Sequence, residues 1–301
     1  MGIADTVPGV SGGTVALILG HYERLVTGIS HIDSHLARLL FQRRWRDAVN
    51  HGDLRFLMVL ALGMAFGILS LASAMHWLLD HRLAETFSLF FGVILASSYL
   101  VAKQIKRWTA GGALLAFVTA SFVYVLAQAN SLTGSEHGAY LFVAAMIAIC
   151  AMILPGISGA FVLLLLGTYY PVTSLVKELA SGNANSEILS RIALFVLGCL
   201  VGLLLFSRLL KYLLRQHATL TYCALLGLML GSLRKLWPLQ KPTAETVGEK
   251  FSLRKWELVP PDQWSGSLVT LLLIALGGTA IVLALDAWGS RLQSGKQDVE
   301  A

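Results

Sequence analysis

Charged residues are scarce in this sequence, and cysteines are scarcer still. Asp, Glu, Lys and Arg make up 13% of the 301 residues, against 56% hydrophobic residues and a mean hydropathy of +0.70. Because soluble domains carry about 25% charged residues, this composition excludes an ordinary water-soluble domain and indicates a membrane protein. The three cysteines, Cys150, Cys199 and Cys223, all lie in apolar runs, which favours a packing role over a disulfide or metal framework.

Two further features are missing. No charged segment followed by a cleavage site opens the chain, so we expect no removable signal peptide. The net charge of +6 is not gathered into a basic domain but lies in short loops beside apolar segments, as the positive-inside rule requires. The charge therefore indicates orientation in a membrane and not a nucleic-acid partner.

Six apolar segments are long enough to cross a hydrocarbon core of about 30 Å, which takes about 20 residues per helix. They lie near residues 55–79, 87–107, 110–129, 190–213, 219–236 and 267–288. The sequence therefore predicts an all-α polytopic membrane protein that contacts the lipid bilayer along most of its length.

One unusual phrase occurs twice. Its first copy is Pro8-Gly9-Val10-Ser11-Gly12-Gly13, and its second, 147 residues later, is Pro155-Gly156-Ile157-Ser158-Gly159-Ala160. Residues 8–22 and residues 155–169 are identical at nine of fifteen positions. Pro and Gly interrupt a helix and free backbone groups that hydrocarbon cannot satisfy. A broken helix that recurs in both halves of a membrane protein is the best sequence pointer to a transport site.

The repeat extends along the chain. The pair Gly63 and Gly67 recurs as Gly198 and Gly202 at an offset of 135. The simplest role of two glycines four residues apart is close helix packing. We therefore expect two units, each with a broken segment and three crossings. The first repeat covers 1–130 with its broken segment at 1–23, the second covers 138–290 with a re-entrant hairpin at 139–172, and 291–301 form a polar tail.

The two units are predicted to be inverted relative to each other. If both broken segments enter and leave on one side, each unit crosses the membrane an odd number of times. The loop charges agree, because four arginines follow the first broken segment (residues 38–46), whereas Lys177 after the second is balanced by Glu178. Such a reversal of charge is expected when equivalent loops lie on opposite sides.

Each broken segment offers a place for an anion. A new half-helix is expected to begin near Ser11 and near Ser158, where the first backbone N–H groups lack partners and the helix dipole is positive. Small residues let a ligand approach the backbone, and hydroxyl groups add donors, so we expect the ligand to be a phosphate or a carboxylate. The candidate substrate-binding residues are Pro8, Gly9, Ser11, Gly12, Gly13, Thr14, Pro155, Gly156, Ser158 and Gly159.

Charged residues near the phrases suggest further roles. Asp5 and Glu23 flank the first phrase, and ionisable residues in a membrane segment are costly and usually functional, so they are candidates for coupling to H⁺ or Na⁺. Arg24, a further candidate substrate-binding residue, is expected to pair with Glu23. Arg55 and Arg191 begin equivalent crossings, where they would gather anionic headgroups or anchor their helices by snorkelling. No metal site and no cofactor is predicted.

The two phrases resemble the signatures of a known family. The run from Gly2 to Thr14, followed by Gly20-His21-Tyr22-Glu23, is similar to the first signature of the polyprenyl-phosphate transporter family (PopT), and Cys150 to Gly159 is similar to the second. With the crossings, the resemblance covers nearly the whole chain. Family members carry a further apolar segment before the first signature. Seven residues precede Pro8 here, so either the start lies upstream or the first hairpin lacks an arm.

The resemblance implies a multi-pass protein of the bacterial cytoplasmic (inner) membrane that flips undecaprenyl phosphate to the cytoplasmic leaflet, for recycling in cell-envelope synthesis. Alternating access by two rocking halves would hold the phosphate at the half-helix ends and leave the polyprenyl tail in the bilayer. The coupling ion and the formation of a homo-oligomer are left open.

Two other classes of function are open at this stage. Undecaprenyl-diphosphate phosphatases have a similar phrase, Pro-Gly-x-Ser-Arg-Ser, but this chain has Gly12-Gly13 and Gly159-Ala160 where that phrase has Arg and Ser. The Glu-x-x-x-Glu pair, Glu245 and Glu249, lies in a polar loop away from both phrases, which disfavours hydrolysis. An ion-coupled transporter of small anions could use the same helix ends, with a closed aqueous pathway in place of a groove open to lipid.

Overall fold

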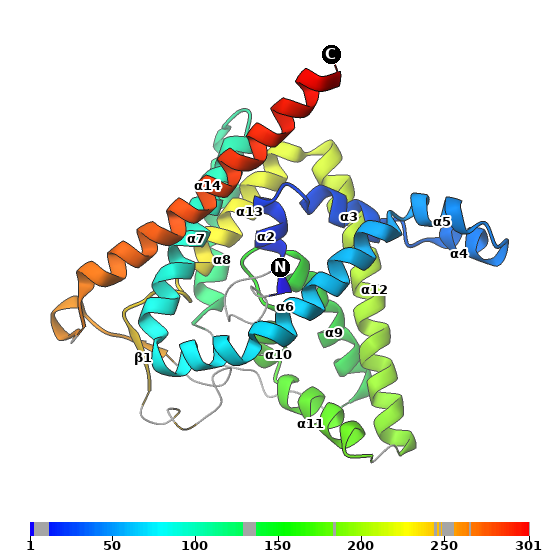
Figure 1. The fold of residues 1–301 in the computed structure, drawn as a ribbon. Coiled ribbons are helices and arrows are strands. Elements are labelled where there is room, and N and C mark those ends of the chain that lie inside the picture. Colours follow the sequence, from blue (N-terminus) through cyan, green and yellow to red (C-terminus); the bar gives the residue numbers. More distant parts are fainter. Residues whose placement is uncertain are drawn as a thin grey trace.

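The computed structural model is a largely helical chain, drawn in Figure 1. It describes residues 1–2, 12–128, 137–182, 185–243, 246, 248, 256–264 and 266–300. The helices before residue 130 are α2 (Gly12–Ile18), α3 (Tyr22–Ser30), α4 (Ser34–Phe41), α5 (Trp45–His51), α6 (Leu54–His81), α7 (Leu83–Gln104) and α8 (Ala110–Leu126). The later elements are α9 (Gly138–Ile153), α10 (Gly159–Leu165), α11 (Tyr169–Ala180), α12 (Ser186–Gln216), α13 (Ala218–Ser232), β1 (Gln240–Pro242), β2 (Trp256–Leu258), η2 (Pro261–Gln263) and α14 (Leu268–Glu300).

Each of the six expected crossings corresponds to one helix. Among the described residues, α7, α12 and the 268–287 part of α14 are long and apolar enough to cross a membrane by themselves. The helices α8 and α13, and residues 54–67 of α6, are apolar but shorter; the 15 residues of α13 reach about 22 Å at 1.5 Å per residue. The helical class is thereby confirmed, and several of the helices are apolar enough to cross a membrane.

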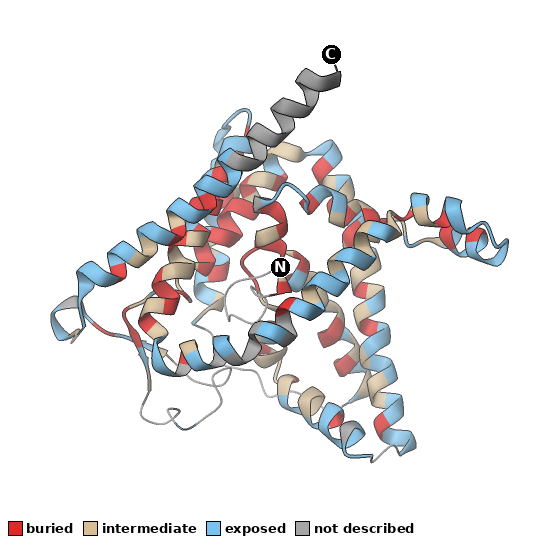
Figure 2. Cartoon of the chain, in the orientation of Figure 1, coloured by how far each residue is buried: buried red, intermediate tan, exposed pale blue. Residues whose placement is uncertain are grey.

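The centre of the molecule is built from two helix pairs that pack through glycine. The helix α13 packs along α8, and α14 packs along α7. A Cβ atom on Gly227 would clash with the carbonyl oxygen of Ala116 in α8, and one on Gly92 would clash with that of Ala275 in α14. Because Gly227 follows Gly92 at the repeat offset of 135, the two halves make the same kind of contact at equivalent positions. Buried residues, red in Figure 2, concentrate in these central helices.

A third close pair joins α9 to α12. Gly198 and Gly202 of α12 lie against the backbone of α9, where a Cβ atom on either residue would clash with the carbonyl of Phe142 or Met146. Their repeat equivalent Gly63, in α6, has no atom within 4 Å of such a Cβ. The glycine pair therefore packs closely in the second half, whereas α6 leaves the position of Gly63, the equivalent of Gly198, open.

The outward faces of the long helices are apolar. In α12, Leu197, Leu200 and Leu205 are half exposed or more, and in α14 Leu272 and Leu273 are exposed by about three-fifths. Exposed leucines on this scale would be a liability in water and are the expected surface of a helix that faces lipid.

A short helical hairpin projects from the bundle (Figure 1). Its two helices, α4 and α5, occupy a stretch that the sequence analysis treated as a basic loop. Asp33 caps α4 by accepting the N–H of Leu36 at 2.9 Å, and Leu36, Leu39 and Ala48 form a small core of their own. The hairpin therefore folds through a cap and a local apolar cluster.

Candidate functional site

The residue that follows the first phrase, Thr14, contacts the second phrase in the interior. Thr14, at the start of α2 and fully buried, accepts the backbone N–H of Gly156 through its Oγ1 atom at 3.1 Å. Eight residues further along the first half, the Tyr22 hydroxyl donates to the carbonyl of Ile153 at 3.2 Å. Two segments 142 residues apart in sequence thus share a hydrogen bond at the candidate site.

Part of the first phrase cannot be placed. Gly12, Gly13 and Thr14 belong to α2, whereas Asp5, Pro8, Gly9 and Ser11 lie outside the described residues. The expected half-helix start at Ser11 is therefore a prediction for that side of the site.

The second phrase forms a tight turn between α9 and α10. The buried Pro155 ends the apolar run of α9, and Gly156 has a φ of +87°, a backbone conformation that favours glycine. A Cβ atom on Gly156 would also lie 3.0 Å from the carbonyl oxygen of Leu228, so the turn is pressed against α13. Ser158 occupies the N-cap position of α10 without a side-chain capping bond, which leaves its hydroxyl able to serve a ligand. The chain bends again by 113° between α10 and α11.

A small cavity opens beside this turn. Its walls come from the turn itself, from the ends of α8 and α13, and from α10. The lining residues are Val123, Leu126, Ala127, Gly156, Ile157, Ser158, Phe161, Ser232 and Lys235. The space is about that of one water molecule, so the cavity is nearly closed in this conformation.

Lys235 is the charged residue of the cavity. Its Nζ atom lies over the ring of Phe161, 2.8 Å from the centroid, in a cation–π arrangement, and it forms no ion pair with any described residue. The preceding Arg234 has its Nε atom buried without a hydrogen-bond partner in the described part of the chain. A cation without an acidic partner beside a broken helix is suited to an anionic ligand.

Lys235 was not among the predicted site residues. It lies at the end of the expected crossing 219–236, close to Trp237. The contact with Phe161 spans 74 positions (235 − 161) and has no local signal. The one available clue was a pair of cations, Arg234 and Lys235, directly adjoining an apolar crossing.

The predicted pairing of Arg24 with Glu23 is wrong. Arg24 instead forms a bidentate ion pair with Asp53, in which Nε donates to Oδ2 at 2.5 Å and Nη2 donates to Oδ1 at 3.1 Å. Neighbouring residues of α3 project from different sides of a helix, so Arg24 reaches the start of α6. Glu23 accepts a hydrogen bond from the Tyr222 hydroxyl of α13 at 2.7 Å.

The predicted cationic residues do not line the cavity. Arg55 is exposed at the start of α6. Arg191 pairs with Glu187 one turn earlier in α12, at 2.8 Å. Neither these two arginines nor Arg24 is among the lining residues, so the structure brings Gly156 and Ser158 together with Lys235 and leaves the three arginines elsewhere.

These features define a class of protein. A chain of apolar helices in which a broken segment is bonded to the other repeat in the interior, beside a cation with no ion pair among the described residues, has the architecture of a membrane transporter. The particular family follows from comparison with known proteins. Residues 1–252 match the VCA0040-like family, described as undecaprenyl phosphate translocase-like, and the chain belongs to that family.

Two relatives support the assignment. The chain is 36% identical over 303 aligned residues to the polyprenyl-phosphate transporter of Vibrio cholerae serotype O1, covering 97% of this chain and 94% of the relative. It is 32% identical over 253 residues to the polyprenyl-phosphate transporter of Staphylococcus aureus, covering 79% of this chain and 83% of the relative. No solved structure gives a significant match. The family and both relatives are transporters by name and not enzymes, which removes the phosphatase alternative.

Proposed function

We propose that this protein flips polyprenyl phosphate, undecaprenyl phosphate in particular, across the bacterial cytoplasmic membrane and so returns the carrier lipid to cell-envelope synthesis. The names of the family and of both relatives support this substrate. The observation that carries the proposal is the bond between Thr14, directly after the first phrase, and Gly156 of the second, beside Lys235, which has no ion pair among the described residues. A phosphate monoester needs such a combination of hydrogen-bond donors and positive charge in a lipid-facing protein.

The phosphate would be held chiefly by side chains. The half-helices α2 and α10 have seven residues each, so few peptide dipoles add up along them and the contribution of the helix dipole is small. Lys235 supplies a formal charge, and the uncapped Ser158 hydroxyl supplies a donor next to it. Because the cavity is nearly closed and the Lys235 amino group rests on Phe161, the phosphate enters when that amino group turns away from the ring.

Movement of the lipid would follow from rocking of two inverted repeats, residues 1–130 against residues 138–290. The matching contacts of Gly92 and Gly227 support the repeat, and the breaks around α10 support a re-entrant segment. Glu23 is the candidate coupling residue, because its bond to Tyr222 joins the two units. Binding of H⁺ or Na⁺ at Glu23 would alter its hydrogen bond with Tyr222. Asp5 is proposed for the same role from the sequence alone.

The test is transport in liposomes. The purified protein is reconstituted with undecaprenyl phosphate, and loss of the lipid from the outer leaflet is followed. We expect Lys235→Met to reduce the initial rate about 10–100-fold, because a hydrogen bond to a charged group contributes about 1.5–3 kcal/mol. Ser158→Ala should give a smaller loss, and Lys106→Met, which changes an exposed lysine between α7 and α8, should move the lipid at the normal rate.

The outcomes separate the substrate from the site. Normal movement by both Lys235→Met and Ser158→Ala would keep the function and move the phosphate site elsewhere. Absence of lipid movement, with uptake of inorganic phosphate into the same liposomes, would replace lipid flipping by small-anion transport.

A further inference from the structure

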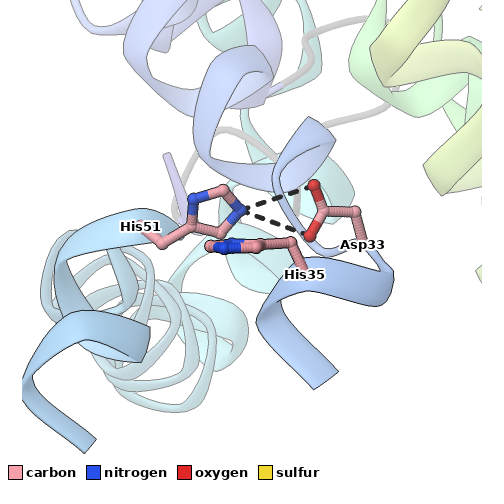
Figure 3. Close-up of side chains that lie close together, drawn as sticks. All are labelled: Asp33, His35 and His51. Carbon is pink, nitrogen blue, oxygen red and sulfur yellow. Dashed lines mark hydrogen bonds and ion pairs between the residues drawn. The ribbon is translucent and has the colours of Figure 1, made fainter. Parts of the chain in front are cut away.

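A cluster of polar side chains that does not contribute to the cavity lies at the base of the α4–α5 hairpin (Figure 3). Asp33 caps α4, His35 lies in the first turn of α4, and His51 is the last residue of α5. The His51 Nε2 atom is 3.2 Å from one carboxylate oxygen of Asp33 and 3.4 Å from the other. One ligand atom from each of the three side chains lies within 4.8 Å of the other two.

Neighbouring side chains fix the central ring. His31 stacks on His51 with 5.0 Å between ring centroids, and His35 meets His51 edge-on at 4.6 Å. The Lys211 amino group lies 2.7 Å from Nε2 of His31; because an ammonium group has only donors, His31 accepts at that atom. His31 is therefore engaged by Lys211, whereas the Asp33 carboxylate and His51 face each other and the His35 ring lies beside His51 (Figure 3).

We propose that Asp33, His35 and His51 bind a divalent transition-metal ion of the zinc class. One carboxylate oxygen and two imidazole nitrogens suit Zn²⁺, whereas Mg²⁺ and Ca²⁺ prefer oxygen ligands alone. Three protein ligands leave a fourth position for water. The Leu36 N–H donates to the Asp33 carboxylate and so would help to orient it as a ligand.

The geometry needs only a small adjustment. Tetrahedral Zn²⁺ with bonds of about 2.0–2.1 Å brings its ligand atoms to about 3.4 Å from one another, closer than the 4.8 Å limit of the present cluster. His35 is exposed and Asp33 and His51 are partly buried, so rotation of the His35 ring can close the site. The exposure also provides an entry path for the ion.

A bound ion would tie the first turn of α4 to the last turn of α5. The hairpin core consists of Leu36, Leu39 and Ala48, with Leu54 packed against it, and so small an apolar cluster gains much from a metal link. Lys211, which contacts His31, is a cation that would oppose the ion. The site should therefore stabilise the hairpin, and its affinity should rise when Lys211 loses its charge.

The experiment measures Zn²⁺ binding to the full chain, purified in detergent without a histidine tag. We expect one Zn²⁺ per chain by equilibrium dialysis, and a visible absorption band of tetrahedral Co²⁺ that added Zn²⁺ removes. Asp33→Asn keeps the capping oxygen of α4 but removes the carboxylate, and His35→Gln removes one imidazole. Each variant should weaken Zn²⁺ binding at least about tenfold, whereas Lys211→Met should strengthen it.

The control is His81→Gln, which changes an exposed histidine that stacks on Trp77 outside the cluster. It should bind Zn²⁺ as the unchanged chain does, and circular dichroism should show equal helix content in all variants. A chain that binds no Zn²⁺, or whose Zn²⁺ binding survives in both Asp33→Asn and His35→Gln, would overturn the proposal. The Asp33–His51 contact would then only hold the two ends of the hairpin together.

Discussion

The Oγ1 atom of Thr14 accepts the backbone N–H of Gly156 at 3.1 Å, and both residues are buried. The bond joins the start of α2 to the turn between α9 and α10. A buried N–H of a broken helix has lost its helical partner and must find another. Thr14 supplies that partner from the other half of the chain, so the break in one half is satisfied only when both halves are assembled.

Removal of the Thr14 hydroxyl should therefore destabilise the joined halves. In Thr14→Val the Gly156 N–H stays buried without an acceptor, which costs about 1–3 kcal/mol. Unfolding of the purified protein in detergent, followed by tryptophan fluorescence, measures the loss. Thr14→Ser keeps the hydroxyl in place and should retain most of the stability; equal losses in the two variants would show that the methyl group, and not the hydrogen bond, matters at this position.

Three glycine-to-alanine changes test the central packing. In Gly92→Ala and Gly227→Ala the added Cβ atom meets a carbonyl oxygen of the facing helix, and overpacking of this kind costs about 1–3 kcal/mol. Gly63→Ala places the same atom where nothing lies within 4 Å and should be neutral or stabilise by up to about 1 kcal/mol through helix propensity.

The same unfolding measurement applies to all three glycine variants. All three positions lie inside helices, so the gain in propensity is shared and the difference isolates the clash. Equal stabilities of Gly63→Ala and Gly227→Ala would contradict the close approach of α13 to α8.

The positions of the crossings could be predicted because long apolar runs leave the chain few alternatives in lipid. The segment expected at 190–213 is α12, Ser186–Gln216, and that expected at 87–107 is α7, Leu83–Gln104. Boundaries differ by a few residues since caps set them, as Asn185 does when it accepts the Ile188 N–H at the start of α12. The α4–α5 hairpin was missed although Asp33, with Leu36 and Leu39 behind it, carries a capping signal and helical spacing.

Contacts between distant segments could not be predicted in the same way. Arg24 was assigned to the adjacent Glu23, but it binds Asp53, 29 positions away. Lys235 and Phe161 meet only because α13 and the turn before α10 pack together. Charge partners depend on tertiary distance, and one sequence gives local spacing alone. The phrase repeat was informative because two copies at a fixed offset carry long-range information that a single motif lacks.

Phe161 should compete with the phosphate for Lys235. If the ring holds the amino group when no anion is bound, Phe161→Leu removes a cation–π contact worth about 0.5–2 kcal/mol and frees the lysine. We then expect the lipid concentration for half-maximal transport to fall between about twofold and thirtyfold. Phe161→Tyr keeps an aromatic face and should leave that concentration near its normal value. A higher half-maximal concentration in Phe161→Leu would mean that the ring helps to bind the lipid.

The bond between Arg24 and Asp53 predicts a pH dependence. The hydrogen bond from the Arg24 guanidinium holds the pKa of the Asp53 carboxyl below its ordinary value, and Asp53 lies just before α6, outside the crossing segment. A lowered pKa means that the ionised carboxylate is favoured in the folded chain, so its stabilisation is fully present above the ordinary pKa of about 3.9. It is lost as the pH falls through the lower, native value.

The measurement compares the unchanged chain with Asp53→Asn, which cannot ionise. The unchanged chain should have the higher unfolding temperature near neutral pH. The difference should begin to shrink below about pH 3.9 and should vanish once the pH is below the lower native pKa of Asp53. It should be small, because the Arg24 and Asp53 side chains are 54% and 34% exposed and solvent screens such pairs. Added salt should reduce it at neutral pH for the same reason. A difference that stays constant from neutral to acidic pH would show that Asp53 supports α6 by packing or capping, and that its charge pair with Arg24 adds nothing measurable.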